Sequence, residues 1–403
     1  MSHCRISAIG LVNALGTSCA EILPKLLAGD RSGVALVPGF LAEGEARLGM
    51  VNCHLPLVPE NLASLRSRNT QLLIASFEQI ASPVAQAIAQ FGAHRVGVVV
   101  GSSTSGIPEG ERAIFSQEGG RGLPEGYNYF QQEMGAVAEI VSTLSGAQGP
   151  SYCISTACSS SAKVFRAGKG LLDSGVCDAV IVGGADCLCR MTVRGFAALE
   201  LLSAQPTNPL SRNRLGINIG EGAALLLLMR EPGGVQVCGV GEASDAYHIS
   251  SPHPEGRGAC SAMQASLKDA GVAPEQIAYL NLHGTGTSHN DAMEARAVAA
   301  VFGEHLPALA CSSTKPMVGH MLGASGATEV AFCAMVLAFA QETGTVFLPP
   351  HVYDGDYDAS LPPLSLVRPG DTLSLGQSCF MMSNSFGFGG SNCAVVLGVR
   401  GEA

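Results

Sequence analysis

Short, largely apolar runs, several of which end at glycine or serine, recur along this 403-residue chain and constrain its fold more than any other feature. They lie at residues 96–100, 152–154, 179–182, 223–228, 235–237, 277–282, 310–312 and 393–397. Apolar runs of this length without polar alternation are typical of strands buried on both faces. Longer helical stretches separate several of them, so the chain is predicted to form a layered α/β fold. Its 50 glycines suit the close approach of neighbouring backbones.

Composition excludes several classes of protein. A formal charge of -10 argues against a dedicated nucleic-acid-binding protein, which would carry a basic surface. We find no uninterrupted apolar run of about 18 residues and no signal peptide, so we expect no membrane insertion. The 14 cysteines include no Cys-X-X-Cys pair. Mostly reduced, buried thiols in a cytoplasmic protein are the expected state.

A weak internal symmetry divides the chain. A predicted strand at 152–154, a turn at Cys158 and a helix at 162–172 are matched by a strand at 310–312, a turn at His320 and a helix at 324–339. A hairpin at Gly233 and Gly234 would separate the halves. We therefore predict two domains, 1–232 with the cysteine and 233–403 with the histidines.

Cys158 is the candidate nucleophile. It lies in the sequence Thr-Ala-Cys-Ser-Ser, between a predicted strand and a predicted helix. The first N–H groups of a helix lack partners and favour negative charge. This setting is expected to lower the pKa of the thiol and favour the reactive thiolate. The alternative is a packed core residue, because unpaired cysteine is among the most buried residue types.

Two histidines lie in glycine-rich turns. His283 begins His-Gly-Thr-Gly-Thr, and His320 ends Lys-Pro-Met-Val-Gly-His. No Gly-Lys-Ser/Thr sequence follows the first turn, so a Walker phosphate loop is excluded. Each histidine has a structural role as its alternative. A zinc site built from His283, His289 and Asp291 lacks the usual ligand spacing, and we expect no metal.

Charged and hydroxyl side chains surround these turns. Lys315 precedes His320 by five residues, and Glu329 is a candidate buried counter-ion for it. Asp291 and Glu294 follow the first turn at helical spacing, which is common for charges at a helix N-terminus.

The hydroxyls of Thr285 and Thr287 are candidates to hold a pantetheine-like chain. Gly-Phe-Gly-Gly at 387–390 precedes a strand rather than a helix, so it is not a dinucleotide site. A mobile aromatic gate at Phe388 fits this motif better.

Taken together, five motifs resemble those of the β-ketoacyl-acyl-carrier-protein synthases. They are Thr-Ala-Cys-Ser-Ser at 156–160, His-Gly-Thr-Gly-Thr at 283–287, Ser-Thr-Lys through Gly-His at 313–320, Gly-Ala-Ser-Gly-Ala at 323–327 and Asn-Ser-Phe-Gly-Phe-Gly-Gly at 384–390. Their order and separations match that family over nearly the whole chain. The chain thus resembles an elongating ketosynthase of the thiolase superfamily.

The resemblance implies a thiolase-like α/β fold, with two pseudo-repeated halves in a five-layer αβαβα arrangement. It implies that Cys158 takes an acyl group from a carrier protein, while His283 and His320 promote decarboxylation of malonyl-carrier protein. The product would be a β-ketoacyl-carrier protein. The other implied roles are an oxyanion hole from the N–H groups of Cys158 and Phe388, a supporting charged pair of Lys315 and Glu329, pantetheine contacts by Thr285 and Thr287, and substrate contacts by Phe386, Phe388 and Gly389.

The resemblance also implies partners. Substrates would arrive on the phosphopantetheine of an acyl carrier protein, with no other cofactor, and the enzyme would be a homodimer or a heterodimer with a chain-length-factor paralogue. Carrier proteins are acidic, so docking requires a local basic patch. Our candidates are Arg66 and Arg68 on one predicted helix, together with Arg194 and Arg212.

Departures from the family pattern leave alternatives open. The family's Pro-Phe-Asp and Arg-Asp-Gly stretch reads Pro-Leu-Ser-Arg-Asn-Arg-Leu-Gly at 209–216, and the loop at 101–106 has fewer glycines. Both features are more similar to the synthases of bacterial aryl polyene clusters. One alternative is a non-catalytic chain-length factor, which would lack Cys158. The other is a coenzyme A-dependent thiolase, which would need a second catalytic cysteine near 387–390, where Cys379 and Cys393 flank the loop.

Overall fold

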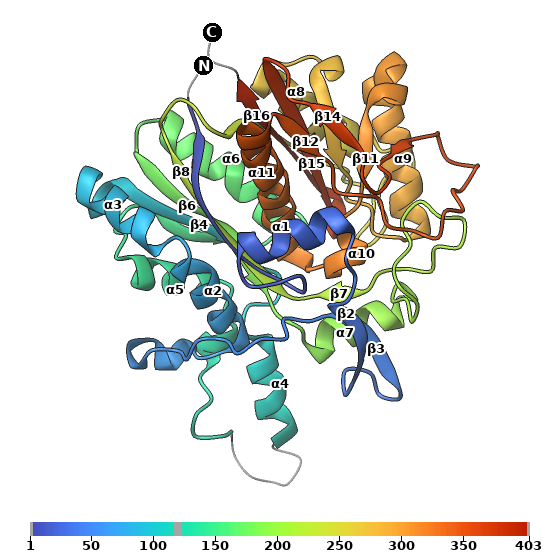
Figure 1. Cartoon of the computed structure of the whole chain (residues 1–403). Helices are drawn as coiled ribbons and strands as arrows, with labels where there is room; N and C mark the ends of the chain where they lie inside the picture. The colour runs from blue at the N-terminus through green and yellow to red at the C-terminus, as the bar shows by residue number, and fades with distance from the viewer. Residues whose placement is uncertain (1–2, 117–122, 401–403) are drawn as a thin grey trace.

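The apolar runs lie in strands of one 11-stranded mixed sheet in the computed structural model, which describes residues 3–116 and 123–400 (Figure 1). The order across the sheet is β13-β11-β10-β15-β16-β9-β1-β8-β6-β4-β5. Its strands are β1 (Arg5–Val12), β4 (Val96–Gly101), β5 (Ser151–Ile154), β6 (Ala179–Asp186), β8 (Gly222–Met229), β9 (Gln236–Ser244), β10 (Ile277–Asn281), β11 (Ala310–Ser312), β13 (Ser365–Leu366), β15 (Ser378–Gly387) and β16 (Ser391–Arg400).

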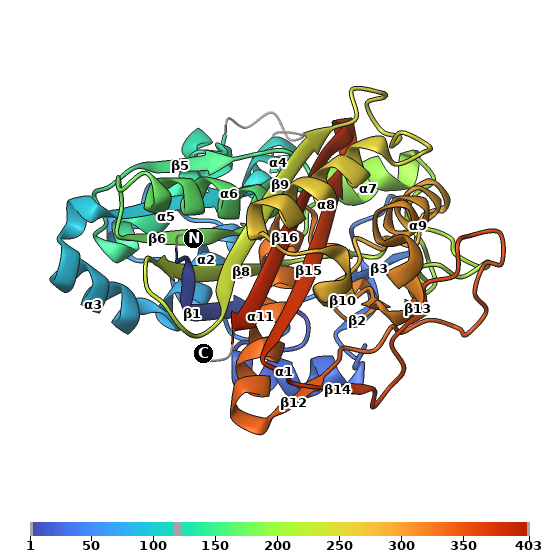
Figure 2. The ribbon, with the colours of Figure 1, turned by 90° about the horizontal axis from the view of Figure 1, so that it is seen from above.

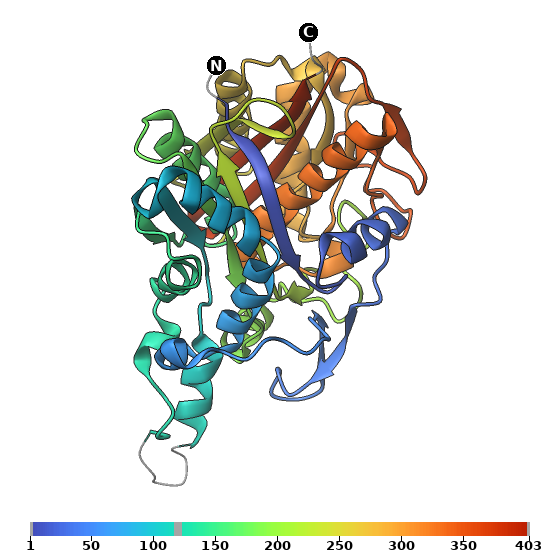
Figure 3. The same ribbon diagram turned by 60° about the vertical axis from the view of Figure 1, so that its left-hand side comes forward.

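Two small sheets lie beside it. One joins β2 (Val34–Pro38), β3 (Glu45–Gly49) and β7 (Ile219–Gly220), and the other joins β12 (Thr345–Phe347) and β14 (Thr372–Ser374). The α-helices are α1 (Cys19–Ala28), α2 (Arg68–Glu78), α3 (Ala81–Phe91), α4 (Ile107–Ser116), α5 (Ala136–Ser145), α6 (Ser160–Asp173), α7 (Arg190–Ala198), α8 (Arg257–Ala270), α9 (Ser288–Phe302), α10 (Lys315–Val318) and α11 (Ser325–Thr343). Of these, α4 projects from one end of the molecule (Figures 1 and 3).

The strand order repeats between the two halves. The first half contributes β1, β4, β5, β6 and β8, and the second contributes β9, β10, β11, β15 and β16, with the two-residue β13 as an additional strand outside β11. When the five strands of each half are numbered in chain order, both sets have the order 3-2-4-5-1 from the outer part of the sheet to its centre. In each half the outer three strands are parallel and the inner pairings are antiparallel. The internal symmetry read from the sequence is therefore present in the topology.

The order restarts between β8 and β9, but these strands do not form the predicted hairpin. β1 lies between them, paired with β8 along its length and with β9 only through Arg5 and Gln236. The hairpin prediction is wrong because the N-terminal strand takes the antiparallel position beside β8. The exact boundary at 232/233 stays a prediction, since both halves share one sheet.

Two helices form the middle layer (Figure 2). α6 contacts β4 and β6 on one side and β9 and β16 on the other, while α11 contacts α6 together with β8, β15 and β16. A Cβ on Gly326 would lie 2.7 Å from the Cβ of Ala162, so glycine allows the two helices to touch. α2, α3 and α5 pack on the first half and α8 and α9 on the second. The result is the five-layer αβαβα arrangement that was predicted.

The central helix α11 is long and apolar because it is buried in the fold. The segment Leu322–Thr343 is long and apolar enough to cross a membrane by length and composition, and α2 with α3 would also qualify if the pair, bent by 70°, were read as one span. However, 89% of the apolar window in the first segment is buried inside the fold. A helix that is apolar all round is expected in such an enclosed layer.

Candidate active site

The nucleophile turn begins where β5 ends. Ala157 has a φ of 53°, in the left-handed region that a non-glycine residue enters at a cost. This bend turns Cys158 away from the strand direction immediately before Ser159, which precedes α6. Helix α6 is slightly longer than the predicted 162–172. Cys158 is 5% exposed, as a packed core residue would be. It also lines a pocket, so burial and access to a substrate are combined at this position.

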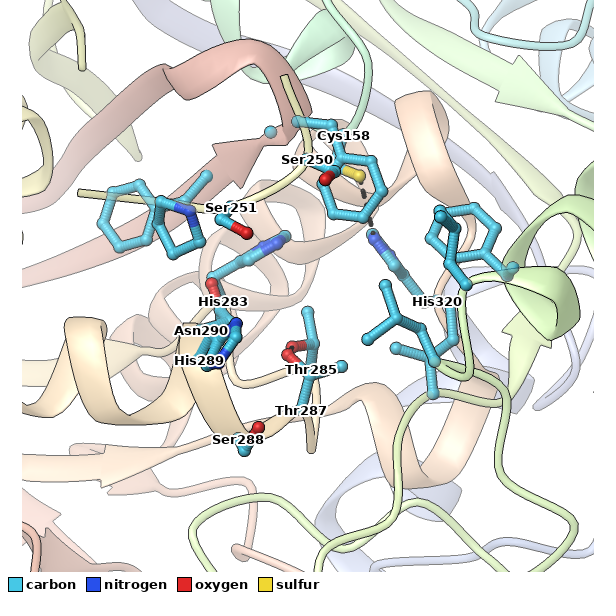
Figure 4. A pocket seen from close by; sticks show the side chains of 18 of the residues that line it. Cys158, Ser250, Ser251, His283, Thr285, Thr287, Ser288, His289, Asn290 and His320 are labelled. Atoms are coloured by element: carbon cyan, nitrogen blue, oxygen red, sulfur yellow. Dashed lines mark hydrogen bonds between the residues drawn. The ribbon is translucent and has the colours of Figure 1, made fainter. Parts of the chain in front are cut away.

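His320 follows α10 and the positive φ of Gly319. Its Nε2 lies 3.1 Å from Sγ of Cys158 (Figure 4). Its Nδ1 lies 3.0 Å from Oγ of Ser325. The backbone N–H of His320 donates to the carbonyl of Asn218 at 2.7 Å. The ring is therefore fixed from both sides, and Ser325 is a site residue to which the sequence analysis gave no role. Its signal was its place in the Gly-Ala-Ser-Gly-Ala motif, five residues after His320.

His283 is held by its backbone just beyond β10. Its N–H and that of Gly284 donate to the two carboxylate oxygens of Glu294, each at 2.7 Å. The ring lies edge-on to that of His320, with 5.3 Å between centroids. Burial raises the pKa of Glu294 to about 7. Glu294 is thus a buried support for the His283 turn rather than an ordinary charge at the start of a helix.

Lys315 and Glu329 form the predicted charged pair. Nζ lies 2.6 Å from Oε1, and both side chains are 1% exposed. Burial and the nearby Lys315 ammonium together hold the pKa of both His283 and His320 well below the usual value. Both imidazoles are consequently neutral at neutral pH, the state in which they can donate a hydrogen bond or accept a proton.

The thiol pKa differs from the sequence expectation. Burial raises the pKa of Cys158 to about 11, although the Lys315 charge and hydrogen bonds with the backbone of Phe388 and Cys158 act in the opposite direction. The prediction of a lowered pKa is wrong because removal from water outweighs the favourable N–H groups. Cys158 therefore rests as a thiol and needs a base during attack.

A pocket of about 240 Å³ opens onto these groups. Its lining joins both halves of the chain and includes Cys158, Phe196, Leu199, Leu201, Ile217, Ser250, Ser251, Pro252, His283, Thr285, Thr287, Ser288, His289, Asn290, His320, Phe386, Gly387, Phe388 and Asn392. Figure 4 shows Cys158, His283 and His320 converging at one end, with Thr285 and Thr287 farther along. The threonine hydroxyls lie 3.0 Å apart. Gly389 is not part of the lining, and its N–H donates to the carbonyl of Ile249.

Comparison with known proteins accords with this geometry. Family models described as β-ketoacyl synthase, N-terminal domain, and β-ketoacyl synthase, C-terminal domain, match residues 70–232 and 235–346. The 3-oxoacyl-acyl-carrier-protein synthase 2 of Coxiella burnetii is 32% identical, over 97% of this chain and 97% of that protein. The chain belongs to the β-ketoacyl synthase family. The protein of the same name from Synechocystis is 30% identical over the same shares of both chains.

Solved structures match this β-ketoacyl synthase over its whole length. A chain in the complex of a ketosynthase with its chain length factor from Xenorhabdus doucetiae is 41% identical, with a TM-score of 0.91, and the match covers 99% of this chain and 98% of that one. A β-ketoacyl synthase from Burkholderia phymatum is 26% identical with a TM-score of 0.85, covering 100% of both chains. The thiolase-like fold class is thereby confirmed.

The four arginines proposed for docking differ in their surroundings. Arg66 follows a short 3-10 helix and Arg68 begins α2, so the prediction that they share one helix is wrong. The intervening Ser67 caps α2 by accepting from the N–H of Thr70, which starts a new helix there.

Two of the arginines are committed to carboxylates. Nε of Arg68 donates at 2.7 Å to Glu221, which is fully buried, and Arg212 pairs with Asp356. Nε of Arg194 donates to the carbonyl of Phe40 at 3.0 Å. The Arg66 side chain is 58% exposed and lies 3.6 Å from Glu60, which is 93% exposed, so its ion pair is the longest and the most exposed of the three.

Proposed function

We propose that this β-ketoacyl synthase condenses an acyl group held on Cys158 with malonyl-acyl-carrier protein, with loss of CO2. The product is a β-ketoacyl-carrier protein. The observation that carries the proposal is the 3.1 Å contact between Sγ of Cys158 and Nε2 of His320, with the His283 ring in the same pocket. A nucleophile, a base and a second neutral imidazole are what the two steps require.

In the first step the sulfur of Cys158 attacks the thioester carbonyl of an acyl-carrier protein. Its proton passes to Nε2 of His320, while Nδ1–H donates to Ser325. The N–H groups of Cys158 and Phe388 stabilise the developing oxyanion. The pantetheine sulfur leaves and takes the proton from His320, which restores the neutral imidazole.

In the second step a malonyl thioester takes the vacated place, and its carbon–carbon bond to the carboxylate breaks to give CO2. The enolate oxygen accepts hydrogen bonds from the neutral rings of His283 and His320. For His320 this step uses the Nε2–H tautomer, in which Nδ1 accepts from the hydroxyl of Ser325. The enolate carbon attacks the acyl carbonyl, a carbon–carbon bond forms and the Cys158 carbon–sulfur bond breaks. The Cys158 thiolate then takes one proton from solvent, which balances the loss of CO2.

Substrates would be delivered on the phosphopantetheine of an acidic carrier protein, with Thr285 and Thr287 contacting that arm and with no further cofactor or metal. We propose a heterodimer with a chain-length-factor paralogue, in a cytoplasmic aryl polyene pathway. The 41% identity to a chain of the Xenorhabdus ketosynthase–chain length factor complex and the departures at 101–106 and 209–216 support this reading.

The alternatives fit the site less well. A thiolase would need a second cysteine at the reacting centre, but Cys379 and Cys393 are buried on β15 and β16 and lie outside the pocket lining. A non-catalytic subunit would have no use for a thiol in contact with an imidazole, whereas Cys158 and His320 make that contact.

Mass spectrometry of acylated protein tests the proposal. C158A should abolish acyl-enzyme formation from acyl-carrier protein, whereas the control C379A should acylate like the wild type. H320A should block malonyl decarboxylation and slow acyl transfer by removing the base, but it should leave some acyl transfer through the small thiolate fraction of Cys158. Persistent acylation of C158A would place the nucleophile elsewhere, and equal loss of both steps in H320A would contradict its separate role in decarboxylation.

A further inference from the structure

Asp186 is a buried carboxylate that the steps above do not use. It is the last residue of β6 and is 0% exposed. Burial raises its pKa, while hydrogen bonds from Ser102, Ser103 and Thr104 oppose that rise. Because a carboxylate held this far from water is costly unless many donors face it, the donors around Asp186 decide what it does.

One oxygen of Asp186 accepts hydrogen bonds from the loop that follows β4. Oδ1 accepts from Oγ of Ser102 at 2.7 Å, from the N–H of Ser103 at 2.8 Å, and from both the N–H and the Oγ1 of Thr104 at 2.7 and 2.8 Å. Oδ2 accepts from the N–H of Ala324 at 3.0 Å. All five contacts are donors, so the ionised acceptor-only form of the carboxylate fits them.

The loop that follows β4 also contacts the turn that carries the nucleophile. Oγ of Ser103 donates at 3.0 Å to the carbonyl of Ala157, the residue before Cys158. Ala157 is the residue held in the left-handed conformation that aims the thiol. A strained turn persists only where its surroundings hold it, and Ser103 supplies one of those contacts.

The second oxygen, Oδ2, binds the segment that contacts the base His320. Ala324 is followed directly by Ser325, whose hydroxyl lies 3.0 Å from Nδ1 of His320. The approach is tight: a Cβ on Gly323 would lie 2.8 Å from Oδ2 of Asp186 and 2.6 Å from Oγ of Ser103. The end of β6, the Ser103 loop and the segment after His320 therefore meet at one point.

We propose that Asp186 is a positioning residue that holds Cys158 and His320 at reacting distance by binding the loops behind both of them. It belongs to the first half and Ala324 to the second, so its two oxygens join the halves where the chemistry occurs. The inference rests on the proposed function. Small displacements of reacting groups reduce rates strongly, which makes such a joint consequential.

D186N tests the proposal because it keeps the shape but turns an NH2 group toward N–H donors. The rate is normalised to the amount of Cys158 that iodoacetamide can alkylate. We expect this normalised kcat for condensation to fall about 100-fold, with KM for malonyl-carrier protein unchanged. The matched control is D178N. Asp178 lies at the opposite end of β6, where it pairs with Arg95 and Arg230, and its loss should leave kcat unchanged.

S103A separates positioning from general stability and decides the matter alone if D186N does not fold. It removes only the contact with Ala157, so acyl transfer to Cys158 should slow about tenfold while malonyl decarboxylation stays at the wild-type rate. Wild-type kcat in D186N, or equal effects of S103A on both steps, would overturn the proposal. A wild-type enzyme that is alkylated but does not condense would instead refute the proposed function.

Discussion

Replacing Lys315 with methionine should destabilise the protein strongly. Methionine retains most of the side-chain length but removes the ammonium that lies 2.6 Å from Glu329, with both side chains 1% exposed. The second oxygen of Glu329 has no hydrogen-bond partner among residues 3–116 and 123–400. K315M therefore leaves a buried carboxylate without compensation, and breaking a buried pair in this way costs about 3–5 kcal/mol.

The double variant K315M/E329Q supplies the matched comparison. Both charges are then gone and the remaining cost is that of a buried amide without full partners, about 1–3 kcal/mol. The double variant should consequently be more stable than the single one. The measurement is the free energy of unfolding in urea for all members of the cycle, including E329Q.

The pH dependence of the same cycle checks the cause. Burial already raises the pKa of Glu329 in the folded protein, and loss of Lys315 raises it further. A raised folded-state pKa means that stability is lost as pH rises above the pKa of the unfolded chain, whose ordinary value is 4.5. The penalty in K315M should therefore be larger at pH 8 than at pH 5. An equal penalty at both pH values, or no recovery in the double variant, would refute the reasoning.

Three further predictions concern the pH profile of decarboxylation, the alkylation of Cys158 and docking. Because both imidazoles have a pKa well below the usual value, neither should titrate between about pH 6 and pH 8. Any change in the rate of malonyl decarboxylation across that range should come from Glu294, whose pKa is about 7, and should vanish in E294Q; a loss of rate near pH 6.5 that persists in E294Q would mean that His283 or His320 titrates there. Alkylation of Cys158 should rise with pH toward its pKa of about 11. R66E should raise KM for acyl-carrier protein about two- to five-fold and leave small thioester substrates and the exposed-arginine control R112E unaffected; an equal effect on small thioesters would exclude docking as the cause.

Much of the fold could be predicted because its strands are short apolar runs with clear ends. β4, β6, β8, β11 and β16 all contain their predicted segments, and β10 ends one residue before the end of the predicted 277–282. The position of β1 between β8 and β9 could not be predicted, because pairing across more than 200 residues leaves no local signal in Gly233 or Gly234.

In the site too, features encoded by neighbouring residues could be predicted, whereas features that depend on distant segments could not. Cys158, His283 and His320 were found from their turns, and the Lys315–Glu329 pair from the family pattern. The direction of the Cys158 pKa was missed because burial by distant segments cannot be read from a helix start. Asp186 was missed for a related reason: its donors come from two loops that meet only after folding.

The repeated strand order bears on how this chemistry can be gained or lost over evolution. The sulfur comes from the first copy of the motif and both imidazoles from the second, so each copy is specialised and neither suffices by itself. One codon change at position 158 would silence the reaction while leaving the sheet and outer surfaces unchanged. An inactive sister protein that keeps its ability to assemble is therefore a short mutational step away.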